Sequence, residues 1–521
     1  MVEKFGLQEY DDVTKRKIMG IRLTMLVADY SDAIPYTFAE NISLDTVTKI
    51  EESSYLLPGV ETEVDTTRQY VSGTIATHIL GNIGSIYAEE WDELKEKGYS
   101  YDDHIGKSGI EKACEDDLRG KNGVRTTIRD SSGNVVSSEI TTPPQAGNSV
   151  VLTIDRNLQQ VAQDSLKSLI DERQATDSGK YANAGSVVVY KVSTGEVLAA
   201  VTYPSYDMET YNKDYSSLLN DSRLPLFNRA FSGVYAPGST FKAATASIGL
   251  QLGEITPDET IFCKKYYTYY EDYQPTCMHY DGDVNVVDAI KVSCNYFFYE
   301  TGRRIGITKL NEYCKKYGLG VKTGLEIDEA SGVLAGKEYR EAVGSYWTDG
   351  DTLQAAIGQS DNGFTPIQLA VYTGTLANGG TRYRAHLVKE VCDYNMDSVV
   401  RNVEPEAIES TGISQSVYDV VKKGMLSVTT DGTAASVFSD YPIQVGGKTG
   451  TATVYDKGVE YNNGIFIAFA PYENPEIAVV TVVEKGGYGS GCTKTAQDIF
   501  DAYFFYQGET YTGQNAGILM K

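Results

Sequence analysis

The apolar strands of this chain fall into two groups far apart in the sequence, and this separation strongly limits the folds it can adopt. Two strand-like runs, residues 185–190 and 196–202, are joined by a Ser-Thr-Gly turn. Further strand-like runs lie between residues 445 and 484, and residues 494–506 are typical of a helix. The stretch between the two groups, roughly 225–430, is mixed and largely helical. We therefore predict an α+β domain with one antiparallel sheet, helices on both of its faces, and a helical lobe.

The first part of the chain has the character of a separate, mixed domain. Residues 123–140 are typical of a hairpin that turns at the Ser-Ser-Gly-Asn run, and residues 141–147 (TTPPQAG) have the composition of a linker. A chain of 521 residues is also too long for one ordinary domain. We predict two domains, residues 1–147 and residues 148–521.

The chain is strongly acidic and contains no membrane span. Asp and Glu number 71 against 46 Lys and Arg, a net charge of −25, which repels nucleic acid and anionic lipid. No run reaches the ~18 apolar residues that a span needs. The best early candidate, Ile18 to Val27, is short and contains Arg22. Nucleic acid is therefore not expected as a partner, and the protein is either cytosolic or trimmed of a membrane anchor.

Ser239 and Lys242 form a Ser-x-x-Lys pair before a helical run, residues 243–252. Residues three apart share one helix face, so the hydroxyl and the amine can meet within a turn. A serine beside an amine that can be neutral is an activated nucleophile without histidine. The pair alone is a weak signal, because a helix cap followed by a solvated lysine has the same letters.

A second serine element occurs twice. Residues 293–295 (SCN) lie inside an apolar segment, residues 287–299, whereas residues 360–362 (SDN) come shortly before a Thr-Pro helix start and are typical of a turn and cap. Because an apolar segment can hold a hydroxyl rigidly in the helical lobe, this contrast favours Ser293 and Asn295 as site residues.

A Lys-Thr-Gly element also occurs twice. Lys448, Thr449 and Gly450 follow a Val-Gly-Gly run and continue through Thr451 into a strand-like segment. Small residues there let a substrate backbone lie along the strand edge. Residues 322–324 lie in a glycine-rich loop followed by acidic residues, which is typical of a surface turn. The sequence therefore favours Lys448 as the functional lysine.

Together these three elements resemble the penicillin-binding serine transferases and β-lactamases, which share this motif set. The surrounding phrases are similar to class B penicillin-binding proteins: YAPGSTFK (235–242), SCNYFFY (293–299), TPIQL (365–369), GGKTGTAT (446–453) and FIAFAPYENPEIAVV (466–480). Upstream phrases look like the pedestal domain of the same proteins: HILGNIG (78–84), GKSGIE (106–111) and LRGKNG (118–123). The resemblance covers nearly the whole chain, is closest to the elongation-type enzymes of the rod system, and implies a pedestal followed by a transpeptidase domain.

The resemblance implies a serine D,D-transpeptidase that cross-links peptidoglycan. Ser239 would attack the carbonyl of the penultimate D-Ala of a stem peptide while Lys242 takes its proton. The Lys242 amine must then be neutral, and a second nearby cation, Lys448, would favour that form. Ser293 would relay the proton to the leaving D-Ala, which Asn295 holds.

The remaining matched residues would bind the substrate. Lys448 and Thr449 would hold the terminal carboxylate of the donor, on a strand that Gly450 keeps open. The backbone N–H groups of Ser239 and Thr451 would form the oxyanion hole. An amine of a neighbouring stem peptide would open the acyl-enzyme, and β-lactams would be trapped at that stage. The resemblance requires no cofactor for this reaction.

The same resemblance implies a location and partners. Members of the family normally begin with a short cytoplasmic tail, one membrane helix and the first part of the pedestal, and these are missing from this chain. The full-length protein is thus expected to be a single-pass protein of the cell membrane, with this part on the extracytoplasmic side. Its expected partners are D-Ala-D-Ala stem peptides, β-lactams and a membrane glycosyltransferase of the rod system.

Cys263, Cys277 and His279 lie between the first two motifs. Soft sulfur and nitrogen ligands at this spacing could hold zinc if a fourth joined, such as Asp281 or Cys294. Some elongation-type relatives carry zinc near this place, by resemblance. A disulfide between the first two cysteines is equally compatible with the sequence outside the cytoplasm, as is neither arrangement.

Two other functions share the three motifs. A β-lactamase must also deacylate quickly, and one class does so with a Glu-x-x-x-Asn loop that is missing between Asn295 and Lys448. A wall scaffold without enzymatic activity would not need Ser239, Lys242, Ser293 and Lys448 to be intact, and a non-enzymatic β-lactam sensor would need a signalling segment, which is not visible in the sequence. These features favour the transpeptidase.

Overall fold

The computed structural model describes residues 2–27, 36–57, 59–62, 68–100, 103–131 and 135–505. Within these ranges, no helix is both long enough and apolar enough to cross a membrane. The chain divides into two compact units. Unit 1 comprises Met1–Thr67 and Asn122–Pro144, and unit 2 comprises Arg68–Lys121 and Gln145–Lys521.

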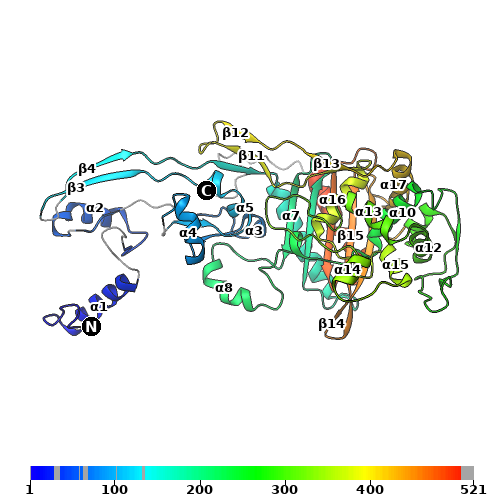
Figure 1. The fold of residues 1–521 in the computed structure, drawn as a ribbon, viewed down its shortest axis with the longest axis horizontal. Coiled ribbons are helices and arrows are strands. Elements are labelled where there is room, and N and C mark those ends of the chain that lie inside the picture. The colour runs from blue at the N-terminus through cyan, green and yellow to red at the C-terminus, as the bar shows by residue number, and fades with distance from the viewer. Residues whose placement is uncertain are drawn as a thin grey trace. The chain divides into compact units, whose positions relative to one another are not determined.

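Unit 1 contains short helices and a long hairpin (blue to cyan in Figure 1). Its elements are α1 (Asp12–Val27), α2 (Leu44–Glu52), the 3-10 helix η1 (Ser54–Leu56), β3 (Val124–Arg129) and β4 (Val135–Thr142). Ser43 caps α2 by accepting a hydrogen bond from the Thr46 N–H. The antiparallel pairing of β3 with β4 confirms the hairpin predicted at residues 123–140, although residues 132–134 of its turn lie outside the described part.

Residues 68–121 belong to the same unit as the C-terminal part of the chain. Their elements are α3 (Thr77–Leu80), β1 (Ile83–Ser85), α4 (Ala88–Glu96), β2 (His104–Gly106), α5 (Gly109–Ala113) and α6 (Glu115–Leu118). The His78 ring hydrogen-bonds the Pro225 carbonyl at 2.7 Å, and Arg401 pairs with Asp117 at 2.6 Å. The domain boundary after residue 147 stays a prediction.

A five-stranded antiparallel sheet forms the centre of unit 2. Its strands, in spatial order, are β14 (Gly446–Asp456), β15 (Val459–Ala470), β16 (Ile477–Glu484), β6 (Ala184–Lys191) and β7 (Val197–Tyr203). The two strand groups, distant in sequence, join where β16 pairs with β6 in continuous register. This pairing leaves β14 at one edge of the sheet, where a substrate backbone could lie beside it.

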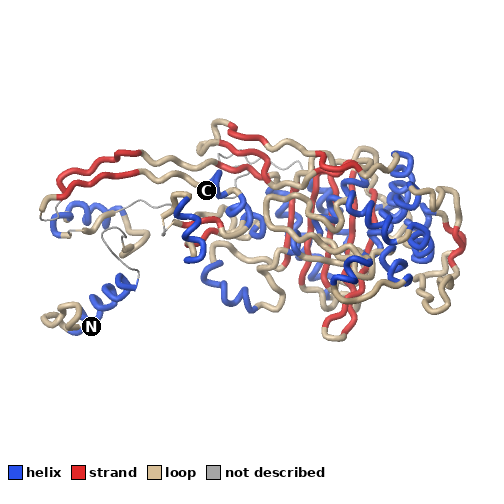
Figure 2. The backbone as a smooth tube through the Cα atoms, in the orientation of Figure 1, coloured by secondary structure: helices blue, strands red, loops and turns tan. Residues whose placement is uncertain are grey.

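Helices cover both faces of this sheet, as Figure 2 shows by the blue coils on either side of the red strands. α7 (Arg156–Gln174) and α19 (Thr493–Phe504) pack together on one face, and α16 (Pro366–Ala377) packs on the other. Asp155 caps α7, and Leu158, Ala162, Leu166 and Leu169 bury the stripe that meets the sheet. The predicted α+β fold is confirmed.

The remaining helices of unit 2 lie mostly between β7 and β14 in the chain. They are α8 (Tyr211–Asn220), α9 (Arg229–Ser232), η2 (Gly238–Phe241), α10 (Lys242–Gln251), α11 (Val286–Lys291), α12 (Asn295–Ile305), α13 (Ile307–Lys316), α14 (Lys337–Ala342), α15 (Asp349–Ala356), α17 (Gln415–Thr430), α18 (Ala435–Phe438) and η3 (Gly489–Cys492). α10 is almost wholly buried and contacts α12 and α17, which makes it the centre of the predicted helical lobe.

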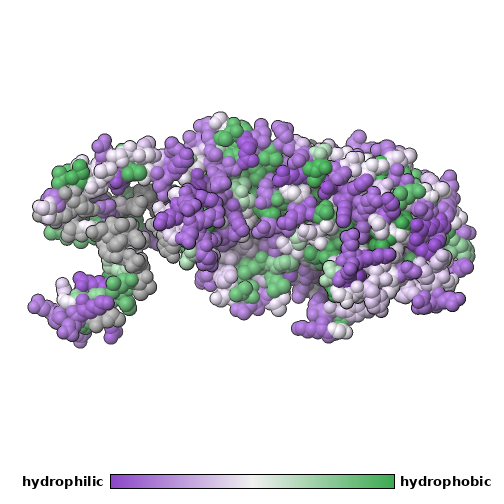
Figure 3. Space-filling model, in the orientation of Figure 1, coloured by the Kyte–Doolittle hydropathy of each residue, from purple (hydrophilic) through white to green (hydrophobic). Residues whose placement is uncertain are grey.

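Short strands complete the unit. β8 (Ile261–Cys263) pairs with β9 (Gly282–Val284), and β10 (Thr381–Tyr383) pairs with β13 (Ala407–Ser410). β11 (Val388–Cys392) lies between β5 (Ser149–Leu152) and β12 (Val399–Asn402). Hydrophilic residues cover much of the face that Figure 3 presents, as the charge of −25 leads one to expect.

Candidate active site

Ser239 and Lys242 lie where the short η2 turn passes into α10. The Lys242 side chain is fully buried, while Ser239 is partly exposed. None of the hydrogen bonds in the described part of the chain involves the Ser239 hydroxyl. The Ser-x-x-Lys pair thus combines an accessible hydroxyl with a buried amine one turn away.

The Lys242 amine is directed at the turn that contains the second motif. Its Nζ donates hydrogen bonds to Asn295 Oδ1 at 2.5 Å, to the Ser293 carbonyl at 2.7 Å and to the Ser293 hydroxyl at 3.1 Å. The first two motifs, more than 50 residues apart in sequence, are therefore joined by one amine.

Ser293 lies in the tight connection between α11 and α12, with a φ of +62°. The Cys294 N–H bonds the Ala289 carbonyl at 2.9 Å, and the Ser293 N–H bonds the Ile290 carbonyl at 3.3 Å. A left-handed φ is uncommon for a residue with a side chain, and it persists only where the surroundings hold it. Two packed helices thus hold the Ser293 hydroxyl in one direction.

Lys448, on the edge strand β14, completes the group. Its side chain is fully buried, and its Nζ lies 3.0 Å from the Ser293 hydroxyl and 3.1 Å from the Thr449 carbonyl. The Ser293 hydroxyl is therefore within hydrogen-bond distance of two lysine amines, one from α10 and one from the sheet.

Burial dominates the electrostatics of both lysines. It lowers the pKa of Lys242 to about 8, against the opposing effect of negative charge on Cys277, Cys294 and Asp281. Burial also lowers the pKa of Lys448 well below its usual value, and the neighbouring Lys242 lowers it further. Burial is thus the main cause of the lowered pKa of Lys242, and the expected contribution of Lys448 to the neutral form of Lys242 stays a prediction.

The rest of the third motif lies against η2 and the residues around it. The Thr449 hydroxyl is 2.7 Å from that of Thr433. A Cβ at Gly450 would lie 2.7 Å from a Thr240 methyl carbon, and a Cβ at Gly238 would lie 2.5 Å from the Thr451 carbonyl oxygen. The two glycines allow this close approach, which brings the backbone before Ser239 against β14.

The second copies of two motifs lie elsewhere. Ser360 sits in the turn before α16, with its hydroxyl 3.5 Å from Asp351, and Thr365 with Pro366 begins the helix as predicted. Ser360 also has a positive φ, +60°, so the contrast between segment and turn does not separate the two serines. Their contacts do separate them, because Ser293 is bonded by both buried lysines. Lys322 is exposed on a loop.

Sequence reasoning missed three residues that shape this site. Gln359 Nε2 donates to the Thr451 carbonyl at 3.3 Å, and the Gly358 carbonyl accepts from the Gly238 N–H at 2.9 Å. Thr433, the partner of Thr449, lies in the turn before α18. All three act through tertiary contacts, and no local pattern in the sequence distinguishes them.

The structure gathers part of the predicted cysteine group beside the second motif. Ligand atoms of Cys263, Cys277, Asp281 and Cys294 all lie within 4.8 Å of one another. His279 is exposed, and its backbone carbonyl, not its ring, lies 3.7 Å from the Cys263 sulfur. Asp281 and Cys294, the two residues suggested as a fourth ligand, thus both belong to the group, whereas the His279 ring does not.

The sulfur atoms of this group are closely coupled. Cys277 and Cys294 Sγ lie 3.8 Å apart, and the hydrogen bond between them lowers the pKa of Cys277 and raises that of Cys294. Cys277 Sγ also accepts the Asn295 N–H at 3.2 Å. All seven cysteines are free thiols and all are buried. Cys263 and Cys277 therefore form no disulfide in this structure.

Two family descriptions match the chain. The penicillin binding protein transpeptidase domain matches residues 185–504, and the penicillin-binding protein dimerisation domain matches residues 7–152. The chain is 32% identical over 527 residues to the peptidoglycan D,D-transpeptidase MrdA of Escherichia coli strain K12, an alignment that covers 95% of this chain and 80% of the relative. These names indicate no cofactor.

Solved structures agree in fold. Pseudomonas aeruginosa PBP2 in complex with WCK 5153 superposes with a TM-score of 0.71 at 31% identity, covering 85% of this chain and 92% of that chain. A structure on the structural coordination of polymerization and crosslinking by a peptidoglycan synthase complex gives a TM-score of 0.77 at 28% identity, covering 94% and 85%. Since the matched domains and relatives span most of its length, the chain belongs to the class B penicillin-binding proteins.

Proposed function

We propose that this protein is a serine D,D-transpeptidase of peptidoglycan, of the elongation type, which works through an acyl-enzyme on Ser239. One observation carries the assignment of the site: the Ser293 hydroxyl is held between two buried lysine amines, Lys242 and Lys448, beside a partly exposed serine. Buried lysines are costly unless they are neutral or paired, and such groups cluster at functional sites.

In the acylation step the Ser239 oxygen bonds to the carbonyl carbon of the penultimate D-Ala, and the peptide C–N bond to the last D-Ala breaks. Lys242, with a pKa lowered by burial, accepts the hydroxyl proton in its neutral form. The proton then passes through Ser293 to the leaving amine. The hydrogen bonds from Lys242 to Ser293 and to Asn295 support this route.

The substrate lies along β14 in this proposal. Lys448 and Thr449 bind the terminal carboxylate, and Gly450 lets β14 approach the turn that carries Ser239, since a Cβ there would lie 2.7 Å from a Thr240 methyl carbon. The N–H groups of Ser239 and Thr451 stabilise the oxyanion. The close approach of Gly238 to the Thr451 backbone supports an oxyanion hole formed by these two N–H groups together. An amine from a second stem peptide then attacks the acyl carbon, forms the cross-link and releases Ser239.

The test is the intact mass of the protein after incubation with a penicillin, for the parent and for Ser239→Ala. We expect a stable adduct of one penicillin on the parent and none on the variant, with Ser360→Ala as a control that still forms it. A folded parent without an adduct would refute the assignment. An adduct that is lost within seconds would instead identify a hydrolase.

A structural zinc ion is a further part of this proposal. Two sulfurs bound to a tetrahedral zinc at ~2.3 Å lie about 3.8 Å apart, which matches the separation of the Cys277 and Cys294 sulfurs. Cys263 and Asp281 would supply the other two ligands. The ion would hold in place the turn that contains Ser293, because Cys277 accepts a hydrogen bond from the Asn295 N–H in the same motif.

Elemental analysis of the purified protein tests the zinc site. We expect about one zinc per chain, which is lost in Cys263→Ser and kept in Cys314→Ser, a buried cysteine outside the group. A folded parent that holds no zinc even after dialysis against the metal would exclude the site.

For location and partners, we propose a membrane-anchored protein whose described part faces the cell wall, working with a glycosyltransferase of the rod system. The similarity to a structure of a peptidoglycan synthase complex supports the partner. Co-purification of the full-length protein with that glycosyltransferase in detergent tests this pairing. Its absence under conditions in which both proteins are folded would contradict the proposal.

A further inference from the structure

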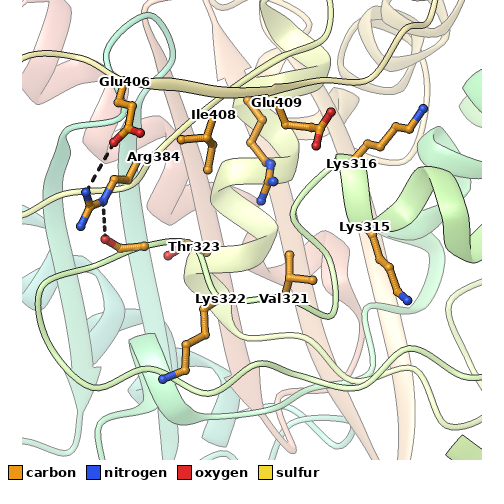
Figure 4. Close-up of a pocket in the computed structure, with 11 residues that line it drawn as sticks. Lys315, Lys316, Val321, Lys322, Thr323, Arg384, Glu406, Ile408 and Glu409 are labelled. Carbon is orange, nitrogen blue, oxygen red and sulfur yellow. Dashed lines mark hydrogen bonds and ion pairs between the residues drawn. The ribbon is translucent and has the colours of Figure 1, made fainter.

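A separate cavity of about 490 Å³ opens on unit 2, outside the candidate active site (Figure 4). It is lined by the end of α13, by the loop at residues 321–324, and by residues on and next to β10 and β13. The loop contains the second Lys-Thr-Gly run of the sequence, which the proposed reaction does not use.

Positive charge is concentrated in this cavity. Lys315, Lys316, Lys322, Arg382 and Arg384 line it, against two acidic side chains, Glu406 and Glu409. In a chain with a net charge of −25, such a local excess of cations is unexpected on composition alone.

Few of these cations are paired within the described part of the chain. Arg384 pairs with Glu406 at 3.4 Å, but both side chains are about half exposed. The side-chain amines of Lys315 and Lys322 make no ion pair or hydrogen bond among the described residues. The Nε of Arg382 is buried without a hydrogen-bond partner, although Glu409 faces it across β10 and β13.

The end of α13 explains only part of the arrangement. Lys315 and Lys316 lie in its last turn, where the helix dipole favours cations. That effect amounts to about half a charge and falls off within one turn, so it does not account for Lys322 or Arg384, which come from other segments.

The loop that presents Lys322 is fixed. The buried carboxylate of Glu329 accepts the Thr323 N–H at 3.0 Å, the Thr323 hydroxyl at 2.7 Å and the Gly324 N–H at 2.8 Å. Gly324 has a φ of +100°, and a Cβ there would lie 2.8 Å from the Arg384 side chain. The glycine thus lets the loop and the arginine pack together, and Arg384 donates to the Gly324 carbonyl at 2.8 Å, so this part of the lining is organised before any ligand arrives.

We propose that this cavity binds a diphosphate group. Cations from three segments line this one cavity, and arginine and lysine together suit the oxygens of a ligand with at least two neighbouring negative charges, such as a diphosphate. The volume lies in the range of small-molecule sites and exceeds the needs of a single phosphate. A free diphosphate and one carried on a lipid have this chemistry in common. The proposal does not depend on the proposed transpeptidase reaction.

Calorimetric titration with inorganic pyrophosphate tests the site. We expect saturable binding by the parent, weakened at least about tenfold in the double variant Lys315→Gln/Lys322→Gln, because each lost contact to a charged group is substantial. Both lysines are exposed, so the variant is expected to fold. Lys337→Gln, an exposed lysine outside the cavity, is the matched control and is expected to bind as the parent does. Added salt is expected to weaken binding.

A second arm distinguishes the two sources of diphosphate. Sedimentation of the parent with vesicles that contain a long-chain isoprenyl diphosphate, reduced in the double variant, identifies the lipid-borne form; pyrophosphate binding without vesicle binding identifies the free form. No binding to either probe, or equal binding by the parent and the double variant, would overturn the proposal.

Discussion

At the scale of single residues, the contacts of Ser293 and Ser360 separate two serines that share both a sequence pattern and a backbone conformation. Each precedes an x-Asn pair, and their φ angles are +62° and +60°. Only Ser293 lies within hydrogen-bond distance of Lys242 and Lys448. Because the backbone strain of the two is alike, a comparison of their alanine variants isolates the contribution of the hydroxyl.

We predict that Ser293→Ala slows acylation by a fluorescent penicillin at least about a hundredfold, as expected for a lost proton-transfer group. Ser360→Ala is predicted to acylate at the parental rate. Stopped-flow measurement of the second-order acylation rate checks both. Equal rates for the two variants would show that the Ser293 hydroxyl does not transfer a proton during acylation.

The second residue-scale prediction concerns pH. Lys242 must be neutral to accept a proton, and its pKa of about 8 means that the neutral form grows as pH rises through that value. Acylation is therefore predicted to rise about tenfold per pH unit below about 8 and to level off above it. Acylation rates measured from about pH 6 to about pH 10 check this sign.

The control for the pH profile is Lys242→Arg, whose guanidinium stays charged throughout. We expect this variant to be at least about a hundredfold slower, with no rise near pH 8. A parental profile that is flat, or that falls with pH, would contradict the role of Lys242 as the proton acceptor.

The sequence predicted the pair Ser239 and Lys242 because helix geometry alone relates positions three apart. Ser293 was favoured by a contrast that does not hold, since it too lies in a turn. What identifies it is contact with amines from α10 and β14, which only the packed fold brings together. For the same reason, Thr433 and Gln359 left no signal in the sequence.

At the scale of elements, the approach of η2 to β14 sets the geometry between nucleophile and substrate strand. A methyl at Gly450 would lie 2.7 Å from Thr240 Cγ2 and 2.8 Å from the Pro237 carbonyl oxygen. Neither neighbour can withdraw without moving the turn that carries Ser239.

We predict that Gly450→Ala destabilises the protein by about 1–3 kcal/mol, the usual effect of overpacking, and slows acylation. Urea denaturation of unit 2, followed by fluorescence, measures the first effect. Gly84→Ala, also in unit 2, where only the flexible Lys107 side chain lies within 4 Å of the added methyl, is the control and is expected to destabilise less. If both variants had the same stability, the close approach would have no energetic significance.

Among the elements, the strands of the sheet and the hairpin of unit 1 followed from periodicity and turn residues. The cysteine group followed only in part. Cys263 and Cys277 were recognised by proximity in sequence, but His279 is exposed and outside the group, and Asp281 with Cys294 complete the set. Sequence spacing does not determine which side chain of a loop turns inward, because that depends on β8, β9 and α12 around it.

At the scale of the whole molecule, a net charge of −25 opposes compactness through self-repulsion. We predict that raising NaCl from about 0.05 M to about 0.5 M increases the thermal midpoint by a few degrees, since this repulsion is screened. Differential scanning calorimetry checks the direction. A decrease would mean that surface ion pairs outweigh the net charge.

All seven cysteines are buried, and they are spread from Cys114, between α5 and α6, to Cys492, just before α19. A thiol is reactive only when solvent and reagent reach it. The native protein is therefore expected not to react with an alkylating dye, and each cysteine becomes labelled only when its own region opens. The order in which the seven cysteines are labelled therefore ranks the local stability of the regions that contain them, and no additional cysteine has to be introduced for this measurement.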